Sequence, residues 1–155
     1  MDITLALGGS GAKGNSHIGV IRRLEKEGYR IRSVAGTSYG GIVGVLYAAG
    51  YSPSEIQTAF EEVDQARLYG RAPQDGPSML GMDGVRKLLD QLLGEKTFED
   101  LRIPCAVTAV DINAGSEVVL SSGLLKDAIL ATIALPGIFP VQRSNDWELV
   151  DGGVL

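Results

Sequence analysis

Residues 31–49 read IRSVAGTSYGGIVGVLYAA, which is an apolar run, a turn that carries a serine, and a second apolar run. The first run is short and holds branched side chains, which favours a β-strand. The second is long enough for a helix and is apolar on almost every side, which is typical of a buried helix. The stretch therefore predicts a strand over 31–35, a tight turn at Ser38 and a helix over 42–49.

The turn itself has the spacing G-x-S-x-G, with Gly36 and Gly40 two residues on either side of Ser38. Glycines are needed there because a strand that bends sharply into a helix brings backbone against backbone. In a nucleophile elbow, this geometry raises the serine hydroxyl above the sheet. Ser38 is therefore the candidate nucleophile of a serine hydrolase.

Strand-like and helix-like segments alternate along the rest of the chain. We expect further strands over 3–7, 103–111, 117–120 and 148–150, and helices over 16–28, 52–64, 84–93 and 124–135, the third of them capped by Asp83. This order predicts one α/β domain over residues 1–155, with a three-layer α/β/α arrangement, helices on both faces and a largely parallel sheet. Residues 66–82 lack periodicity, and they fit either a lid or a plain surface connection.

Charge and composition narrow the class of protein. The formal net charge of −5 disfavours a nucleic-acid partner, because phosphate binding needs a basic surface. The single cysteine, Cys105, lies in an apolar run and is expected to be a buried small side chain. The first residues lack the basic segment of a signal peptide, and no run of 18 apolar residues is present, so we expect a soluble cytoplasmic protein.

A second glycine-rich stretch, GGSGAKG at residues 8–14, follows the first expected strand and opens the first helix. Such a loop can bind a phosphate or form an oxyanion hole. The phosphate-binding P-loop pattern fails because Asn15 stands where lysine is required. Residues 9–14 fit the dinucleotide motif, but the acidic residue expected at the end of the second strand is replaced by the Ser38 turn. These departures disfavour the two phosphate-binding uses and favour an oxyanion hole.

The base that would activate Ser38 must be found elsewhere. His17 is the only histidine and precedes Ser38, so the order serine, acid, histidine cannot be built, and we expect His17 to pack or hydrogen-bond in the first helix. Asp151 is the best placed acid, since it ends a short strand and precedes two glycines. Aspartate is a much weaker base than histidine, so strong stabilisation of the oxyanion is required.

These three motifs together resemble the bacterial patatin-like phospholipases. The resemblance covers nearly the whole chain and includes the segments TFEDLRIP at 97–104 and LPGIFP at 135–140. It implies a Ser38–Asp151 dyad and an oxyanion hole formed by the backbone N–H groups of Gly9, Ser10 and Gly11. Lys13 would order the loop or add positive potential.

The resemblance also implies the reaction, which is hydrolysis of a lipid acyl ester through an acyl-enzyme without metal or organic cofactor. A lipid substrate implies transient contact with a membrane surface. Two departures leave alternatives open: Ser10 stands where many members have glycine, and the chain ends four residues after Asp151, where members usually continue. The expected C-terminal shortening leaves two alternatives, a weak or inactive lipid- or partner-binding module and an acyltransferase.

Overall fold

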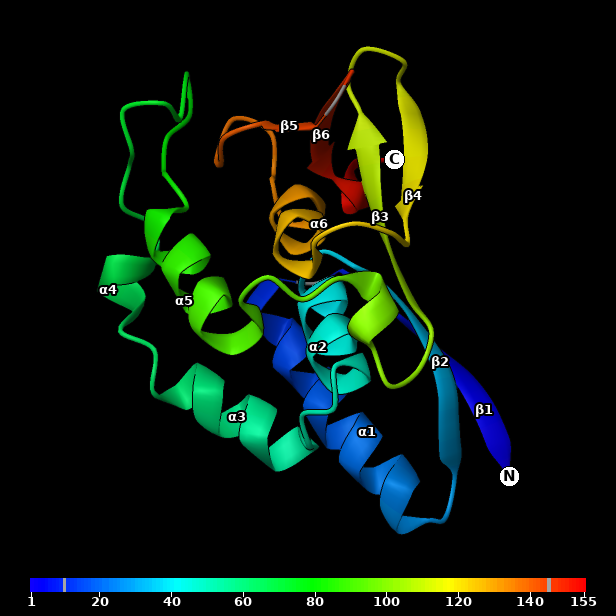
Figure 1. Ribbon diagram of the computed structural model, residues 1–155. Helices are drawn as coiled ribbons and strands as arrows, with labels where there is room; N and C mark the ends of the chain where they lie inside the picture. Colours follow the sequence, from blue (N-terminus) through cyan, green and yellow to red (C-terminus); the bar gives the residue numbers. More distant parts are fainter. Residues whose placement is uncertain (10, 145) are drawn as a thin grey trace.

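A computed structural model describes residues 1–9, 11–144 and 146–155 of the chain (Figure 1). Six strands form one sheet: β1 (Asp2–Leu7), β2 (Arg30–Thr37), β3 (Cys105–Asp111), β4 (Ser116–Leu120), β5 (Gln142–Ser144) and β6 (Trp147–Asp151). The α-helices are α1 (Ser16–Lys26), α2 (Tyr39–Ala48), α3 (Pro53–Glu61), α4 (Gln65–Leu68), α5 (Asp83–Leu93) and α6 (Leu125–Thr132). Short 3-10 helices are η1 (Gly11–Asn15), η2 (Phe98–Asp100) and η3 (Gly152–Val154).

The sheet has a parallel core and an antiparallel remainder. Strands β1, β2 and β3 pair in parallel. Strands β4 and β6 both pair antiparallel with β3, and β5 pairs antiparallel with β6. The predicted α/β fold is confirmed, with a sheet that is parallel at its centre and mixed as a whole.

Strand β3 is the element on which two other strands converge. Strand β2 pairs with the first part of β3, up to Thr37 opposite Thr108, while β6 ends with Asp151 opposite Ala109. Strand β4 occupies the other edge of β3 along this stretch. Strands β2 and β6 therefore run along the same edge of β3 from opposite directions, and their carboxyl ends meet between Thr108 and Ala109.

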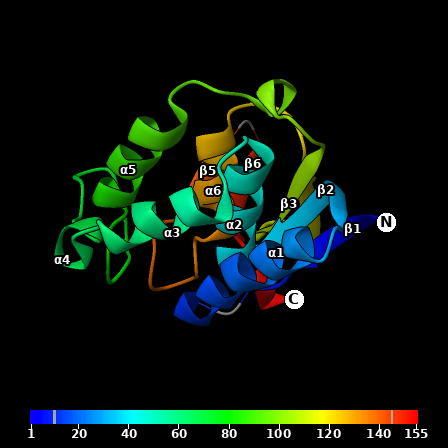
Figure 2. The same cartoon turned by 90° about the horizontal axis from the view of Figure 1, so that it is seen from below.

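The hydrophobic core lies between the sheet and the helices. Ile31 and Val34 of β2 pack into one buried cluster with Ile21 of α1 and with Val43 and Leu46 of α2. Helices α2, α3 and α5 lie to one side of β1 and β2 (Figure 2). Helix α2 is the most buried of these because it is apolar all round, as its sequence predicted.

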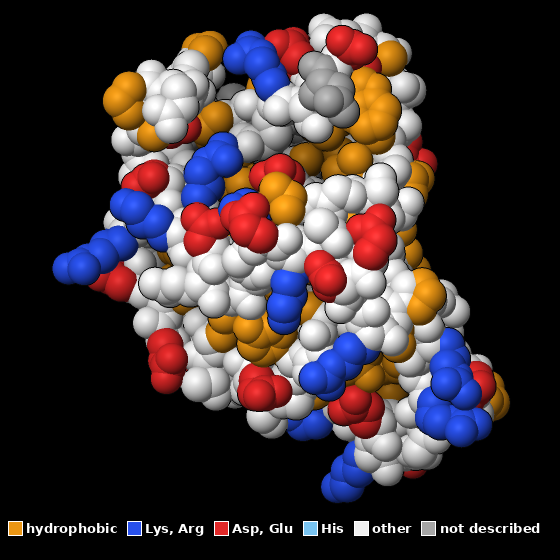
Figure 3. Space-filling view, in the orientation of Figure 1, with side chains coloured by type: hydrophobic (Ala, Val, Ile, Leu, Met, Phe, Trp, Pro, Cys, Tyr) orange, Lys and Arg blue, Asp and Glu red, His pale blue; other side chains and the backbone are white. Residues whose placement is uncertain are grey.

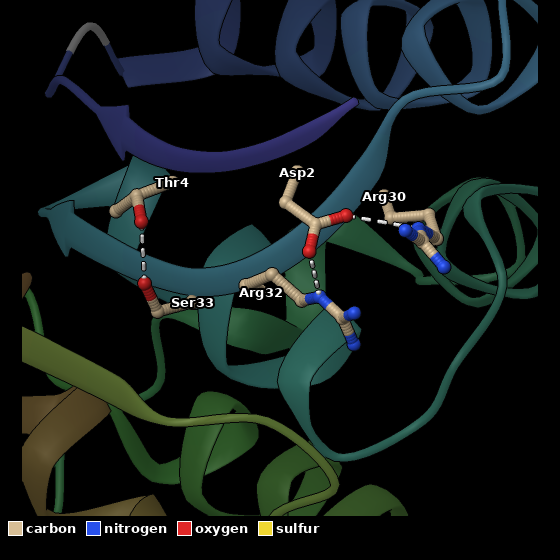
Figure 4. A network of polar contacts seen from close by, with 5 residues as sticks. All are labelled: Asp2, Thr4, Arg30, Arg32 and Ser33. Carbon is tan, nitrogen blue, oxygen red and sulfur yellow. Dashed lines mark hydrogen bonds and ion pairs between the residues drawn. The ribbon is translucent and has the colours of Figure 1, made fainter.

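The opposite face of β1 and β2 is polar and exposed. The carboxylate of Asp2 accepts hydrogen bonds from Nε of both Arg30 and Arg32, at 2.9 Å each, and the hydroxyls of Thr4 and Ser33 lie 2.7 Å apart (Figure 4). The hydrogen bond from Arg32 is the main cause that lowers the pKa of Asp2, and the bond from Arg30 adds to it. No helical layer covers this part of the sheet within the described residues, since Asp2, Thr4, Arg30 and Arg32 are all exposed.

Most predicted elements are present, with three differences. Asp83 does not cap α5 but is its first residue, and its carboxylate accepts from Nζ of Lys87 at 2.7 Å. The irregular segment 66–82 begins inside α4, and β5 was not predicted. Helix α4 and strand β5 are too short for a periodic pattern to show in the sequence. A capping box precedes α3, since Glu55 N donates to Ser52 Oγ at 3.2 Å and Ser52 N donates to Glu55 Oε2 at 2.8 Å.

Candidate active site

Ser38 stands between β2 and α2 in an unusual backbone conformation. It has φ 54° and ψ −126°, and it is the one non-glycine residue with positive φ in the described part of the chain. Such a conformation costs about 1–3 kcal/mol and persists only where the surrounding structure enforces it. The predicted sharp turn is therefore present, and it is strained.

The two glycines of the elbow allow the close packing that enforces this turn. A Cβ on Gly36 would lie 2.5 Å from the carbonyl oxygen of Gly40. A Cβ on Gly40 would overlap the carbonyl oxygens of Leu7 and Gly8, at the end of β1. The spacing G-x-S-x-G thus reflects contact of the turn with itself and with the neighbouring strand.

Asp151 reaches Ser38 from the end of β6. Ser38 Oγ donates to Asp151 Oδ2 at 2.6 Å, and Gly153 N donates to the second carboxylate oxygen at 2.8 Å. The backbone N–H of Asp151 donates to Ala134 O at 2.9 Å. Asp151 is only 6% exposed. The carboxylate is therefore buried, held from its own turn, and in direct contact with the candidate nucleophile.

The glycine-rich loop lies against the elbow. A Cβ on Gly9 would be 3.0 Å from Cβ of Ser38, so the loop backbone approaches the serine directly. Gly11 has φ 56° and lines the same cavity as Ser38. Ser10, the third predicted oxyanion-hole residue, lies outside the described residues. The loop and the nucleophile are neighbours, as the three motifs require.

Tyr39, immediately after the serine, packs against this loop, a contact that no sequence motif indicated. Its ring packs on Gly14, where a Cβ would overlap the ring, and its hydroxyl donates to Asn15 Oδ1. The ring also makes an edge-to-face contact with Phe60. Burial and the nearby Tyr69 raise the pKa of Tyr39 to about 12, so the phenol stays a hydrogen-bond donor.

The other residues noted in the sequence, His17, Lys13 and Cys105, do not line the cavity that contains Ser38. His17 Nε2 lies 2.9 Å from Gly8 O, which confirms its expected hydrogen-bonding role at the start of the first helix. Lys13 is exposed on η1 and is outside the set of residues that line the cavity. Cys105 is buried in β3, as predicted, and burial raises the pKa of its thiol to about 12.

A cavity of about 500 Å³ opens beside Ser38 and Asp151. Ser38, Asp151, Gly9, Gly11 and Asn15 form its polar end. The rest of the wall is almost entirely apolar and comes from α2, α5, α6 and the segments around them, including Ile42, Leu68, Met82, Leu89, Ile129 and Phe139. Such a site can hold a long apolar chain with a reactive polar group at one end.

None of the helices in ranges 1–9, 11–144 and 146–155 combines the length and apolar character needed to cross a membrane. Within the same ranges, no cluster of three or more His, Cys, Asp or Glu side chains is arranged to hold a metal ion.

The family model described as patatin-like phospholipase matches residues 5–155, and the chain belongs to this family. An uncharacterised NTE family protein of Mycobacterium tuberculosis is 36% identical over 156 residues, which cover 99% of this chain and 43% of that protein. Lysophospholipase NTE1 of Mycosarcoma maydis is 31% identical over 170 residues, which cover 99% of this chain and 8% of that protein. The resemblance seen in the sequence is therefore confirmed.

The fold also matches a solved structure, that of VipD from Legionella pneumophila. The TM-score is 0.70 at 16% sequence identity, and the match covers 98% of this chain and 46% of VipD. This similarity confirms the fold class. The chain spans less than half the length of each of these three proteins.

Proposed function

We propose that the chain carries the acyl-hydrolase site of a lipid esterase, with Ser38 as nucleophile and Asp151 as base. The observation that supports it is the 2.6 Å hydrogen bond from Ser38 Oγ to the buried carboxylate of Asp151, at the end of an apolar cavity. Family membership and the similarity to a lysophospholipase support the same class of substrate.

In the first half-reaction, Asp151 accepts the hydroxyl proton while Ser38 Oγ attacks the ester carbonyl carbon. The resulting tetrahedral intermediate collapses and expels the alcohol, which takes the proton from Asp151 and leaves the acyl group on Ser38. In the second half-reaction, Asp151 takes a proton from water, and the water attacks the acyl-enzyme. The fatty acid leaves, and Ser38 regains its proton.

Gly9, Ser10 and Gly11 would provide the backbone N–H groups that hold the oxyanion, and Lys13 would add positive potential nearby. Support comes from the contact of Gly9 with Ser38 and from the place of Gly11 in the cavity wall. The loss of one oxyanion donor typically costs about 2.7–4 kcal/mol of transition-state stabilisation. With an aspartate as the only base, this contribution is essential.

We further propose that the cavity rim contacts a lipid surface. Tyr69 and Leu135 line the cavity and are 41% and 43% exposed. Next to them, backbone hydrogen bonds join Met79 and Leu80 to the loop that follows Leu135, and Met79 is 72% exposed. Hydrophobic side chains lie over the loop before α5, and further hydrophobic patches lie elsewhere on this face among acidic and basic side chains (Figure 3).

The test is hydrolysis of short- and long-chain p-nitrophenyl esters and of phosphatidylcholine vesicles by the wild type, Ser38→Ala and Asp151→Asn. We expect both variants to lose at least about 1,000-fold in kcat, because nucleophile and base act as one unit. A fluorophosphonate probe should label the wild type at Ser38 alone, as read by peptide mass spectrometry.

Each alternative has its own result. Equal rates for the three proteins, or a probe adduct at another residue, would show the dyad assignment to be wrong. Vesicle binding without ester turnover would favour a lipid-binding module. Transfer of the acyl group to an added alcohol in preference to water would favour an acyltransferase.

A further inference from the structure

The backbone of Ser38 is held by a residue that belongs to none of the sequence motifs. The N–H of Ser38 donates to Thr132 Oγ1 at 2.8 Å, and the same hydroxyl donates to Thr108 O at 2.6 Å. Thr132 is the last residue of α6 and is 0% exposed. Its hydroxyl therefore links the strained nucleophile turn to the middle of β3.

Thr108 occupies the point on β3 where β2 and β6 meet, and it contacts both of their turns. Its hydroxyl lies 2.7 Å from the hydroxyl of Thr37, the residue before the nucleophile. A Cβ on Gly152, the residue after the acid, would overlap the carbonyl oxygen of Thr108 and lie 2.5 Å from its hydroxyl oxygen. The nucleophile turn and the acid turn thus rest on one residue.

Helix α6 can bring Thr132 to this place because α2 carries a glycine opposite it. A Cβ on Gly41 would lie 2.9 Å from Cγ2 of Thr132. This accounts for the second glycine that directly follows the elbow. Neither Thr132 nor Thr108 is among the residues that line the cavity, so neither is placed to touch the substrate.

We propose that Thr132 is a positioning residue for catalysis, and that Thr108 is the support it shares with the acid turn. The Thr132 hydroxyl holds the Ser38 N–H, and with it the peptide bond between Thr37 and Ser38, in the observed turn, in which Oγ faces Asp151. This inference rests on the proposed function, because its readout is the chemistry of Ser38.

The test compares Thr132→Ser, Thr132→Val and Thr132→Ala with the wild type. Valine keeps the volume but removes the hydroxyl, so the Ser38 N–H loses this acceptor and Thr108 O loses this donor. We expect Thr132→Val to lose roughly 10- to 100-fold in kcat with KM changed less than about 2-fold, which corresponds to the loss of one or two hydrogen bonds. The rate of fluorophosphonate labelling at Ser38 should fall in parallel, and Thr132→Ser should restore both.

Thr4→Val is the matched control, because it removes a threonine hydroxyl bond on the exposed face of the sheet. It should leave kcat and labelling unchanged. If Thr132→Val does not fold, the pair Thr132→Ser and Thr132→Ala, which differ by one oxygen atom, makes the same comparison.

A hydroxyl-free variant that stays folded and keeps wild-type kcat and labelling rate would overturn the proposal. So would a Thr132→Ser variant as slow as Thr132→Ala. The proposed function fails separately, when Ser38→Ala keeps its activity or the probe labels another residue.

Discussion

Strand β2 passes through two very different environments, and the contrast shows where the structure tolerates change. At its start, Arg30 and Arg32 meet Asp2 on an open face, with arginine side chains 70% and 58% exposed. At its end, Gly36 packs on Gly40 with no room for a methyl group. The start of β2 is held by solvated ion pairs, which contribute little to folding stability. The end of β2 is held by close packing, which a single added carbon atom disrupts.

The largest effect is expected from filling the space at the packed end. Gly40→Ala should destabilise the fold by about 3 kcal/mol or more, because its Cβ would overlap backbone oxygens that cannot move independently. The measurement is the free energy of unfolding from denaturant titration.

Gly19→Ala is the control for that substitution. Gly19 lies inside α1 with nothing within 4 Å of an added Cβ, so alanine should stabilise by up to about 1 kcal/mol. If Gly40→Ala were as stable as Gly19→Ala, the packed end of β2 would tolerate an added methyl group as well as an exposed helix face does, and the comparison would be wrong.

A smaller effect is expected from relieving the strain at the turn itself. Ser38→Gly and Ser38→Ala both remove the hydroxyl, but only glycine accepts φ 54° without cost. Ser38→Gly should therefore be more stable than Ser38→Ala by about 1 kcal/mol, measured by chemical denaturation. Equal stability of the two variants would mean that the turn relaxes once the hydroxyl is removed. The strained φ would then depend on the Ser38 hydroxyl and not on the packing around the turn.

The smallest effect is expected at the open end. Asp2→Asn removes both ion pairs of a solvated carboxylate, and the thermal midpoint at pH 7 should change only slightly from that of the wild type. The arginines lower the pKa of Asp2 in the folded state below its ordinary value of 3.8. The contribution of Asp2 to folding stability is therefore complete above pH 3.8. The contribution is lost as the pH falls through the lower folded value.

The measurement for Asp2 is therefore a pair of thermal scans of wild type and Asp2→Asn, one near neutrality and one in acid. Any difference at pH 7 should shrink in acid. A difference that grows in acid would contradict the assigned direction of the shift.

Local patterns predicted the elements and their order because they act over a few residues. The apolar run before Ser38, the glycines around it and the capping box at Ser52 each specify a backbone conformation within one turn of chain. The same patterns failed for short or ambiguous pieces. Asp83 has the chemistry of a cap but starts α5, and β5 has three residues, too few for a pattern to show.

The sequence by itself determined the family, the alternation of strands and helices, and the identity of the candidate nucleophile and acid. It could not determine that the carboxyl ends of β2 and β6 would meet on one edge of β3, which joins residues 113 positions apart. Only the tertiary structure brought Thr132 to the backbone of Ser38. The reason is physical: a turn or a cap is decided by contacts between near neighbours, whereas the meeting of two distant strands depends on how the whole sheet and its helices pack.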